Sequence, residues 1–344
     1  MMHDGCDSVP GRPTHPIGSV DPDEPADERM SEQTADPAAE SGELSPLQRK
    51  TLGLLRRAAD PVVFDTAFIA ELRSGIDDAF AGFHERLGDL SIFMSKHRLT
   101  SVLGCEVQHL LDDDFSWSPA VAGGQVAHRA VQLMINWRGD PVPADVVDEA
   151  LARLADEDTS IGDWIEGLSE ADLADLRGFA ADKLIKFQEC FPPLDRRAAP
   201  TVESSVRWPV DGPIVLSGKV DLTLGRPAGA ESRKVIIDLK TGWVSPKHRE
   251  DLRFYALVET LRTQIPPRKL ASFYLDAGEP VVEDVNEATL LTAGRRMLDG
   301  VNAEIELRVE GRTPVTRPGT SCRWCPLNAE CGDGIAYLAD RDAD

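Results

Sequence analysis

The feature of this 344-residue sequence that most constrains its fold is an apolar run leading directly into charged residues. The run Val235–Ile237 precedes Asp238-Leu239-Lys240, which is typical of a buried strand whose end emerges from a sheet. Side chains alternate between the two faces of a strand, so Asp238 and Lys240 share a face. The preceding predicted strand carries Asp221 near its end, and pairing of the two strands could bring its carboxylate beside them. The sequence therefore predicts two carboxylates and one ammonium group converging at one place.

This combination of groups suits phosphodiester chemistry. Carboxylates are hard oxygen ligands for Mg²⁺ or Mn²⁺, and a bound ion can polarise a phosphodiester and generate hydroxide from water. The ammonium group of Lys240 can orient that water or stabilise developing negative charge. The simpler alternative is three charged residues at the solvated ends of strands, which is a common arrangement. The apolar run directly before Asp238 favours the functional interpretation.

The first half of the sequence is mainly helical in pattern. Ser45 can cap a helix, Pro46 suits its first turn, and Gln48 completes a capping box. Apolar residues at helical spacing then predict the following segments: a helix from Ser45, a break at Asp60-Pro61, a helix from Phe64 to about Leu90, a helix from Gly123 to about Trp137, and an acidic helical region from Ala144 to about Phe191.

The second half changes to β-strand patterns. Alternating and β-branched residues predict consecutive strands of one sheet over Thr201 to Val210, Ile214 to Leu224 and Lys234 to Leu239. Further along we expect a helix from His248 to Leu261, a strand from Leu270 to Leu275, a helix from Asn286 to about Val309, and a Cys-rich loop from Thr316 to Gly332. The expected fold class is therefore α/β, with a helical N-terminal half, a sheet flanked by helices and a C-terminal Cys-rich loop.

Charge is unevenly distributed along the chain, whose formal net charge is −22. Residues 1–45 hold eleven acidic and two basic residues, six prolines and no aromatic residue, which predicts a disordered acidic tail. We expect a folded domain over 46–338 and a short acidic tail over 339–344. An acidic body argues against non-specific nucleic-acid binding as the main activity, because phosphate binding requires local Lys and Arg. Neither a secretory signal nor a membrane span is evident, which predicts a cytoplasmic protein.

The motifs VDLTLG and IIDLKTG resemble those of the PD-(D/E)XK nuclease superfamily. Surrounding features are similar to its RecB-like branch, which includes the AddB nuclease domain and the CRISPR-associated RecB-type exonucleases. That branch carries a histidine in a helix opening as Gly-x-x-x-His, and Gly124–His128 fits it; taken alone, one His on an apolar helix is more often structural. The resemblance implies a restriction-endonuclease-like mixed sheet and an Mg²⁺ or Mn²⁺ site: His128, Asp221, Asp238 and the carbonyl of Leu239 as ligands, with Lys240 as the catalytic lysine.

A second constellation consists of cysteines. Cys322, Cys325 and Cys331 lie close together in the sequence, and a closed tetrahedral site needs a fourth ligand. Cys6, Cys105 and Cys190 are the candidates, and Cys105 resembles the first ligand of iron-sulfur members of the branch. The resemblance implies a 4Fe-4S cluster held by Cys105, Cys322, Cys325 and Cys331, which would join the N-terminal helices to the C-terminal loop. Zinc in the same thiolates is the alternative, because ligand type alone does not separate the two.

The branch also tends to carry Gln-x-x-x-Tyr on the helix after the catalytic lysine. Tyr255 matches the tyrosine and is a candidate catalytic residue, but Asp251 stands where Gln is expected. Glu203 sits where the family often has a glutamate on a strand. Four residues near Tyr255 either contact phosphates or form a solvated helix face: Lys247, His248, Arg249 and Arg253.

The resemblance covers roughly Ser91 to Cys331, with residues 140–195 as a helical insert. It implies a metal-dependent deoxyribonuclease, by analogy an exonuclease acting on single-stranded DNA ends in repair or recombination. The chain contains no Walker motif, so a helicase or repair partner would supply any motor. The alternatives are a non-catalytic nucleic-acid-binding subunit of a larger helicase-nuclease complex and a nuclease that acts on RNA.

Overall fold

The computed structural model of the chain describes residues 43–56, 59–111, 115–157 and 159–342. The acidic tail expected over 1–45 lies outside them apart from its last three residues. The α-helices are α1 (Pro46–Leu55), α2 (Thr66–Leu87), α3 (Lys96–Leu103), α4 (Glu106–His109), α5 (Pro119–Ile135), α6 (Pro143–Asp156), α7 (Ser160–Glu166), α8 (Glu170–Cys190), α9 (Pro246–Thr263), α10 (Glu287–Arg308) and α11 (Gly332–Asp342). None of these described helices is long and apolar enough to cross a lipid bilayer.

Six strands in this part of the chain form one mixed sheet: β1 (Ile92–Met94), β2 (Thr201–Trp208), β3 (Ile214–Leu224), β4 (Val235–Lys240), β5 (Lys269–Tyr274) and β6 (Glu279–Asp284). Strands β4 and β5 are parallel, whereas β3 pairs with β4, and β5 with β6, in antiparallel register. The connection between the two parallel strands is α9, the crossover helix that parallel pairing requires.

Strand β3 is the organising strand of the sheet. One of its edges pairs with β2 over most of its length. Leu216 pairs with both Trp208 of β2 and Met94 of β1, while Leu222 pairs with both Val202 of β2 and Ile237 of β4. Since a strand has two edges, β1 and β4 share the edge opposite β2, at the two ends of β3. Residues 217–221 of β3 separate them.

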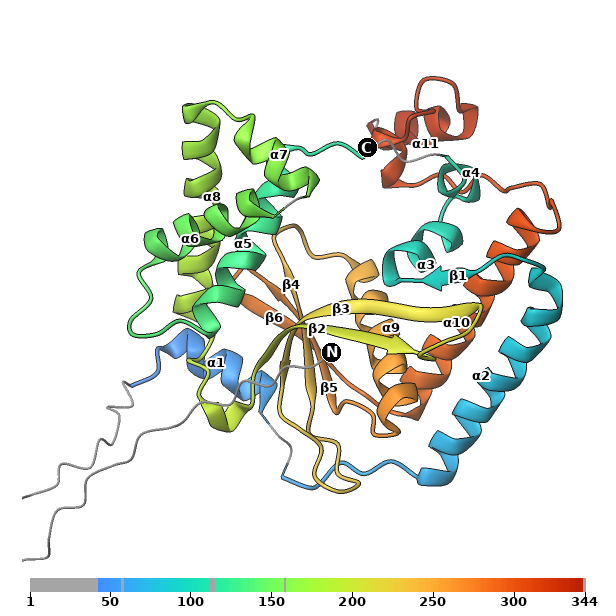
Figure 1. Cartoon of the computed structure of the whole chain (residues 1–344), viewed down its shortest axis with the longest axis horizontal. Helices are drawn as coiled ribbons and strands as arrows, with labels where there is room; N and C mark the ends of the chain where they lie inside the picture. The colour runs from blue at the N-terminus through green and yellow to red at the C-terminus, as the bar shows by residue number, and fades with distance from the viewer. Residues whose placement is uncertain (1–42, 57–58, 112–114, 158, 343–344) are drawn as a thin grey trace, which may run out of the picture. The chain divides into compact units, whose positions relative to one another are not determined.

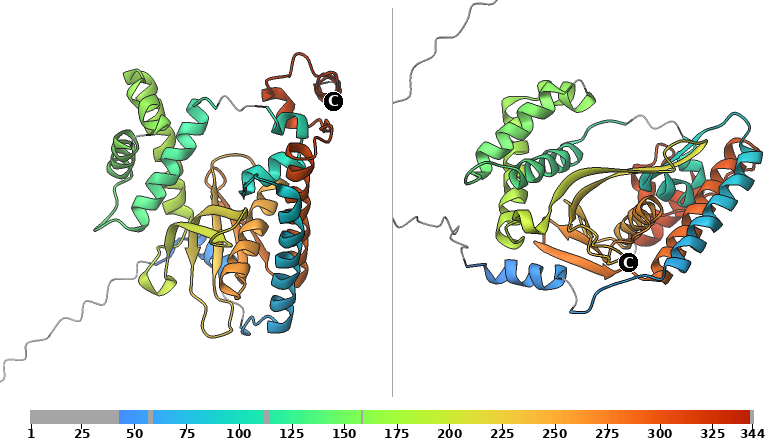
Figure 2. Two further views of the ribbon diagram at one scale, coloured as in Figure 1. Left: turned by 45° about the vertical axis from the view of Figure 1, so that its right-hand side comes forward. Right: turned by 60° about the horizontal axis from the view of Figure 1, so that its bottom comes forward.

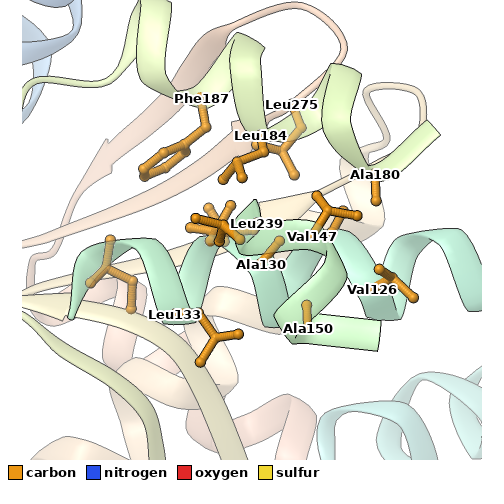
Figure 3. Packing of buried hydrophobic residues seen from close by; sticks show 14 of the residues in the cluster. Val126, Ala130, Leu133, Val147, Ala150, Ala180, Leu184, Phe187, Leu239 and Leu275 are labelled. Atoms are coloured by element: carbon orange, nitrogen blue, oxygen red, sulfur yellow. The ribbon is translucent and has the colours of Figure 1, made fainter. Parts of the chain in front are cut away.

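Helices cover both faces of the sheet. Figure 1 shows α5 to α8 on one side and α2, α9 and α10 on the other, and Figure 2 shows α2 and α10 side by side. Each layer has its own core cluster. Leu239 packs with Ala130, Leu184 and Phe187 in the α5 to α8 layer (Figure 3). Ile236 packs in the other cluster, so strand alternation directs Asp238 and Lys240 toward α3 and α9.

The expected α/β fold, with a mixed central sheet flanked by helices and a helical N-terminal part, is confirmed. Ser45 forms the predicted capping box with Gln48. Five of these α-helices and strands were not predicted: β1, α3, α4, β6 and α11. Strand β1 has only three residues, too few for a periodic pattern. Residues expected as a C-terminal acidic tail are helical as far as Asp342.

Candidate active site

The candidate site lies where β3 and β4 separate. Their ladder ends at the pair Leu222 and Ile237. Beyond it, the Leu239 N–H donates to Asp221 Oδ2 at 2.7 Å, so a side-chain carboxylate takes the place of the next backbone acceptor. Strand β1 pairs with the same edge of β3 at its N-terminal end, residues 214–216. The interruption between β1 and β4 leaves room for side chains within the plane of the sheet.

His128, which the family resemblance singled out, lies beside Asp221. It is on α5, and its Nδ1 is 3.5 Å from Asp221 Oδ1. Burial is the largest single effect and favours the neutral form of both groups. Their mutual attraction, added to the effects of neighbouring charged and hydrogen-bonding groups, outweighs burial, so the pKa of His128 is raised above its ordinary value and the pKa of Asp221 is lowered. The pair is therefore an imidazole and a carboxylate held together by charge.

Asp238 contacts two ammonium groups. Its side chain is only 2% exposed; Lys240 Nζ lies 2.6 Å from Oδ2 and Lys96 Nζ lies 2.8 Å from Oδ1. Burial would lower the pKa of Lys96, but the charge of Asp238 and its hydrogen bond, together with the charges of Tyr255 and Asp221, outweigh burial and the net shift is upward. A carboxylate buried to this degree needs compensating charge. The two lysines supply it.

Lys96 is a site residue that the sequence analysis missed. It is the first residue of α3, directly after the N-cap Ser95, whose hydroxyl accepts the Arg98 N–H. Its ammonium also lies 5.0 Å from the centre of the Tyr255 ring, within cation–π range. The available signal was a Ser-Lys pair following the short apolar run of β1. That signal acquires meaning only once β1 pairs with β3.

Asp251, which stands where the resemblance to the RecB-like branch implies Gln, extends the cluster. Its Oδ2 lies 3.7 Å from Lys240 Nζ, and Thr100 Oγ1 donates to its Oδ1 at 3.4 Å. Burial raises the pKa of Asp251, despite the opposing charges of Lys96 and Lys240. The substitution thus adds a third carboxylate to the network, so that Lys240 stands between Asp238 and Asp251.

The hydroxyl of Tyr255 is bonded to the backbone of β3 and not to the carboxylates of the site. Its hydroxyl donates to the carbonyl oxygen of Lys219 on β3 at 2.7 Å, and burial raises the pKa of Tyr255 to about 12. The ring lies against Gly218, where an added Cβ would be 2.5 Å from a ring carbon. Tyr255 therefore fastens α9 to β3 beside the site.

The basic residues on α9 divide into two groups. Lys247 and Arg249 are exposed. Arg253 is paired with Glu283, its Nε lying 3.0 Å from Oε1, and His248 Nδ1 is 3.0 Å from the Tyr274 hydroxyl. Lys247 and Arg249 are therefore better placed for phosphate contacts than Arg253 is.

Glu203 lies opposite Asp221 at an irregular point of the sheet. It has a positive φ of 52°, which is rare for a non-glycine residue, and its carboxylate pairs with Lys219. Val206 and Trp208 of β2 belong to one core cluster, whereas Val202 packs with the other. The face of the sheet to which every second side chain of β2 points therefore switches at Glu203, next to the candidate site.

The four cysteines singled out in the sequence line one pocket: Cys105, Cys322, Cys325 and Cys331. The N–H groups of Gly319 and Gly334 donate to Cys322 Sγ at 3.3 Å and to Cys331 Sγ at 3.4 Å. Such hydrogen bonds to sulfur accompany thiolate ligands of iron-sulfur clusters. Cys190 is buried elsewhere against Gly278, and burial raises the pKa of its thiol. Cys6 lies outside the described residues.

Glu106, next to Cys105, fastens that segment to the C-terminal loop. Its carboxylate accepts hydrogen bonds from Arg312 and Arg317, and from the Val315 N–H at 2.8 Å. These contacts, that from Arg312 first, lower the pKa of Glu106 to about 2. The two cysteine-bearing segments are thus held together by side chains other than the cysteines.

The donor sets of both places suit metals. Within the described residues, no three His, Cys, Asp or Glu side chains are grouped closely enough to hold one ion as they stand. The candidate site nevertheless offers an imidazole and buried carboxylates, one of them neutralised by two ammonium groups where a divalent cation would serve equally. The cysteine pocket offers four sulfur donors, which suit iron-sulfur or zinc.

Comparisons with known proteins gave a family match and structural matches. The family model of the PD-(D/E)XK nuclease superfamily matches residues 94–332, a range that includes every residue of the candidate site. Among solved structures, a protein from Eubacterium rectale named as a putative exonuclease is 11% identical, with a TM-score of 0.41, covering 70% of this chain and 93% of its own. The protein SSO0001 is 14% identical with a TM-score of 0.26, covering 69% and 95%. The search of curated proteins found no match.

Proposed function

Because this chain belongs to the PD-(D/E)XK nuclease superfamily, we propose that it is a divalent-metal-dependent deoxyribonuclease. The observation that carries the proposal is the grouping of Asp238 and Lys240 beside the pair of Asp221 and His128, where β3 and β4 separate. Family membership alone gives the class of enzyme. The retained carboxylates, imidazole and lysine argue that this member is active.

His128, Asp221, Asp238 and the carbonyl of Leu239 are the proposed ligands of Mg²⁺ or Mn²⁺. An ion bound there would polarise the phosphodiester and lower the pKa of a bound water molecule. Lys240, held by Asp238 and Asp251, orients the attacking water and stabilises negative charge that develops on phosphate oxygens. Tyr255 acts through position, because its hydroxyl is bonded to the Lys219 carbonyl and its ring supports Lys96.

The proposed substrate is DNA, cleaved from single-stranded ends in repair or recombination. This part of the proposal rests on analogy with RecB-like nucleases. Residues 46–338 would form the nuclease domain, with 140–195 as its helical insert, in a cytoplasmic protein that works beside a helicase or repair partner. A non-catalytic subunit of a larger complex is the second candidate, favoured by the acidic composition and by Asp251 in place of Gln.

The cysteine pocket is the proposed site of a structural 4Fe-4S cluster, with zinc as the alternative. Its support is the shared pocket of Cys105, Cys322, Cys325 and Cys331, together with the two N–H groups that donate to sulfur. Iron and zinc contents of protein purified without oxygen, read beside the visible absorbance, distinguish the two metals.

The central test is cleavage of end-labelled DNA. Anaerobically purified protein is incubated with single-stranded and duplex DNA and Mn²⁺ or Mg²⁺, beside a Lys240→Ala variant. Metal-dependent cleavage that falls about 100-fold or more in the variant supports the proposal. The ladder of products gives the direction of digestion, and an RNA oligonucleotide of the same sequence tests the sugar preference.

The same experiment can reject the enzyme. If wild type and Lys240→Ala leave every substrate intact, while circular dichroism shows both to be folded, the stand-alone nuclease is wrong. Binding of DNA without cleavage would then support the non-catalytic subunit.

A further inference from the structure

Trp243 is the most exposed of the large apolar side chains in the described part of the chain. Its side chain is 94% exposed, and its neighbour Val244 is 64% exposed. Neither residue is needed for the core clusters of the sheet. An indole ring presented to solvent beside a second apolar side chain is a surface that a ligand or partner covers.

The connection that carries Trp243 belongs to the candidate site at both ends. It runs from Lys240, the last residue of β4, to Pro246, the first residue of α9, which carries Asp251 and Tyr255. Three residues of extended chain span at most about 11 Å, so the Trp243 backbone lies no farther than this from Lys240. The connection also passes beside α5, because a Cβ on Gly124 would lie 3.0 Å from Thr241 Oγ1.

Trp243 lines a hollow of about 520 Å³ with two further aromatic side chains, Phe179 of α8 and Tyr274 of β5. This volume is in the range of small-ligand sites. Asp276 also lines the hollow, but its carboxylate is paired with Lys183, whose ammonium lies 4.6 Å from the Phe179 ring centre. The hollow therefore offers three aromatic side chains among its lining residues, and its carboxylate is already neutralised.

Cations flank the indole. Lys240 precedes it within the candidate site, and Lys247 and Arg249 follow it as exposed residues of the first turn of α9. Aromatic faces interleaved with cations bind single-stranded nucleic acid without sequence preference, because bases stack on the rings while the cations follow the phosphates. A protein partner offers no comparable reason for cations on both sides of one exposed indole.

We propose that Trp243 is a base-stacking platform that selects single-stranded nucleic acid next to the cleaved phosphate. This inference rests on the proposed nuclease function and adds the reason for strand preference. An unpaired base can leave its neighbours and lie on the indole. In a duplex the base faces are covered by stacking, and the platform is left empty.

Binding to a normal and an abasic oligonucleotide tests the platform. Fluorescence anisotropy of a labelled 12-nucleotide thymidine oligomer, without added divalent metal, is compared with that of an abasic oligomer of equal length and charge. Wild type should bind the thymidine oligomer more tightly. Trp243→Ala should weaken that binding roughly 5- to 150-fold and leave the abasic oligomer unaffected, whereas Trp243→Phe should retain most of the preference.

Val210→Ala serves as the matched control, since it removes another exposed apolar side chain, 72% exposed, from the turn between β2 and β3; it should bind both oligomers as wild type does. The platform is wrong if Trp243→Ala binds the thymidine oligomer like wild type, or if both oligomers lose affinity equally. Hydrolysis of bis(p-nitrophenyl) phosphate with Mn²⁺ separates the two hypotheses. If wild type does not hydrolyse this ester but Trp243→Ala still loses the preference for the thymidine oligomer, the proposed nuclease is rejected and the base-stacking role of Trp243 is supported.

Discussion

Asp238 is a buried carboxylate whose charge is balanced by two lysines, only one of which the sequence motif contains. Lys240 shares its strand, but Lys96 reaches it from 142 residues earlier in the chain. Removing one member of such a cluster changes the affinity for any other cation in it. In the proposed metal site, Lys96 would therefore compete with a divalent ion for Asp238 Oδ1.

Replacing Lys96 by Met tests this competition. Lys96→Met should tighten Mn²⁺ binding about tenfold or more, since one positive charge beside the ion is removed in a site of reduced dielectric. Isothermal titration calorimetry gives the affinity directly. Lys50→Met is the control, because Lys50 pairs with Glu279 with both side chains 53% exposed. Unchanged Mn²⁺ affinity in Lys96→Met would show that Lys96 does not compete with the ion for Asp238.

Gly218 is a residue whose identity follows from its contact with Tyr255. Gly218→Ala places a Cβ 2.5 Å from a buried ring, so α9 must shift or the ring must turn. We expect a loss of about 1–3 kcal/mol in the free energy of unfolding, measured by chemical denaturation. Gly53→Ala is the matched control, since nothing lies within 4 Å of its Cβ and α1 should gain about 0.5–1 kcal/mol. Equal stability of Gly218→Ala and wild type would mean that the contact relaxes freely.

At the scale of elements, α3 and α10 are joined through one buried carboxylate. Glu304 of α10 accepts from Arg98 of α3 at 2.6 Å and lies 2.8 Å from His109 Nε2. Burial would raise the pKa of Glu304, but the hydrogen bonds from Arg98 and His109 lower it. Glu106 makes the equivalent contacts with the C-terminal loop. These carboxylates hold their elements together only while they are ionised.

Acid should therefore weaken this region. The pKa of Glu106 falls from 4.5 to about 2 on folding, so its stabilisation is complete above pH 4.5 and is lost as the pH falls toward 2. Glu106→Gln should lower the melting temperature at pH 7, at a cost of about 1–3 kcal/mol, and show a smaller further loss between pH 4.5 and 3. Thermal unfolding followed by circular dichroism measures both. If the melting temperature of Glu106→Gln changes with pH in parallel with that of wild type, ionised Glu106 is not the source of the acid sensitivity. Glu279→Gln, at an exposed position, is the control and should change in parallel with wild type.

The elements also show what the sequence could and could not predict. The bounds of β3 agree with the structure because alternation and the turn at Asp211-Gly212-Pro213 are local signals. Strand β1 and Lys96 were missed because their meaning depends on pairing with residues 214–216, far away in sequence. The carboxylate of Asp221 was located, but the end of the ladder that positions it depends on both strands. Cys322, Cys325 and Cys331 were selected by their spacing and Cys105 by resemblance, and their common pocket arises only from the tertiary fold.

At the scale of the whole molecule, the cysteine pocket joins residue 105 to residues 322–331. Cys105→Ala should lower bound iron or zinc and the melting temperature together, because a metal ligated across this separation restrains a long loop of the unfolded chain. Elemental analysis and thermal unfolding of the same samples test the link. Cys190→Ala, at a buried thiol outside the pocket, should keep its metal. If Cys105→Ala binds as much metal as wild type, Cys105 is not a ligand of that metal.

Helix α3 sets the distance between the two chemical centres. Lys96 begins it, and Cys105 follows two residues after its end. Its 8 residues make a stiff rod about 12 Å long, with an ammonium on Asp238 at one end and a thiol at the other. A displacement of the thiol is thus carried to the ammonium with little loss. Oxidation of Cys105 should therefore alter the charge balance at Asp238 before the protein unfolds, and the rate of DNA cleavage by the proposed nuclease should change with it.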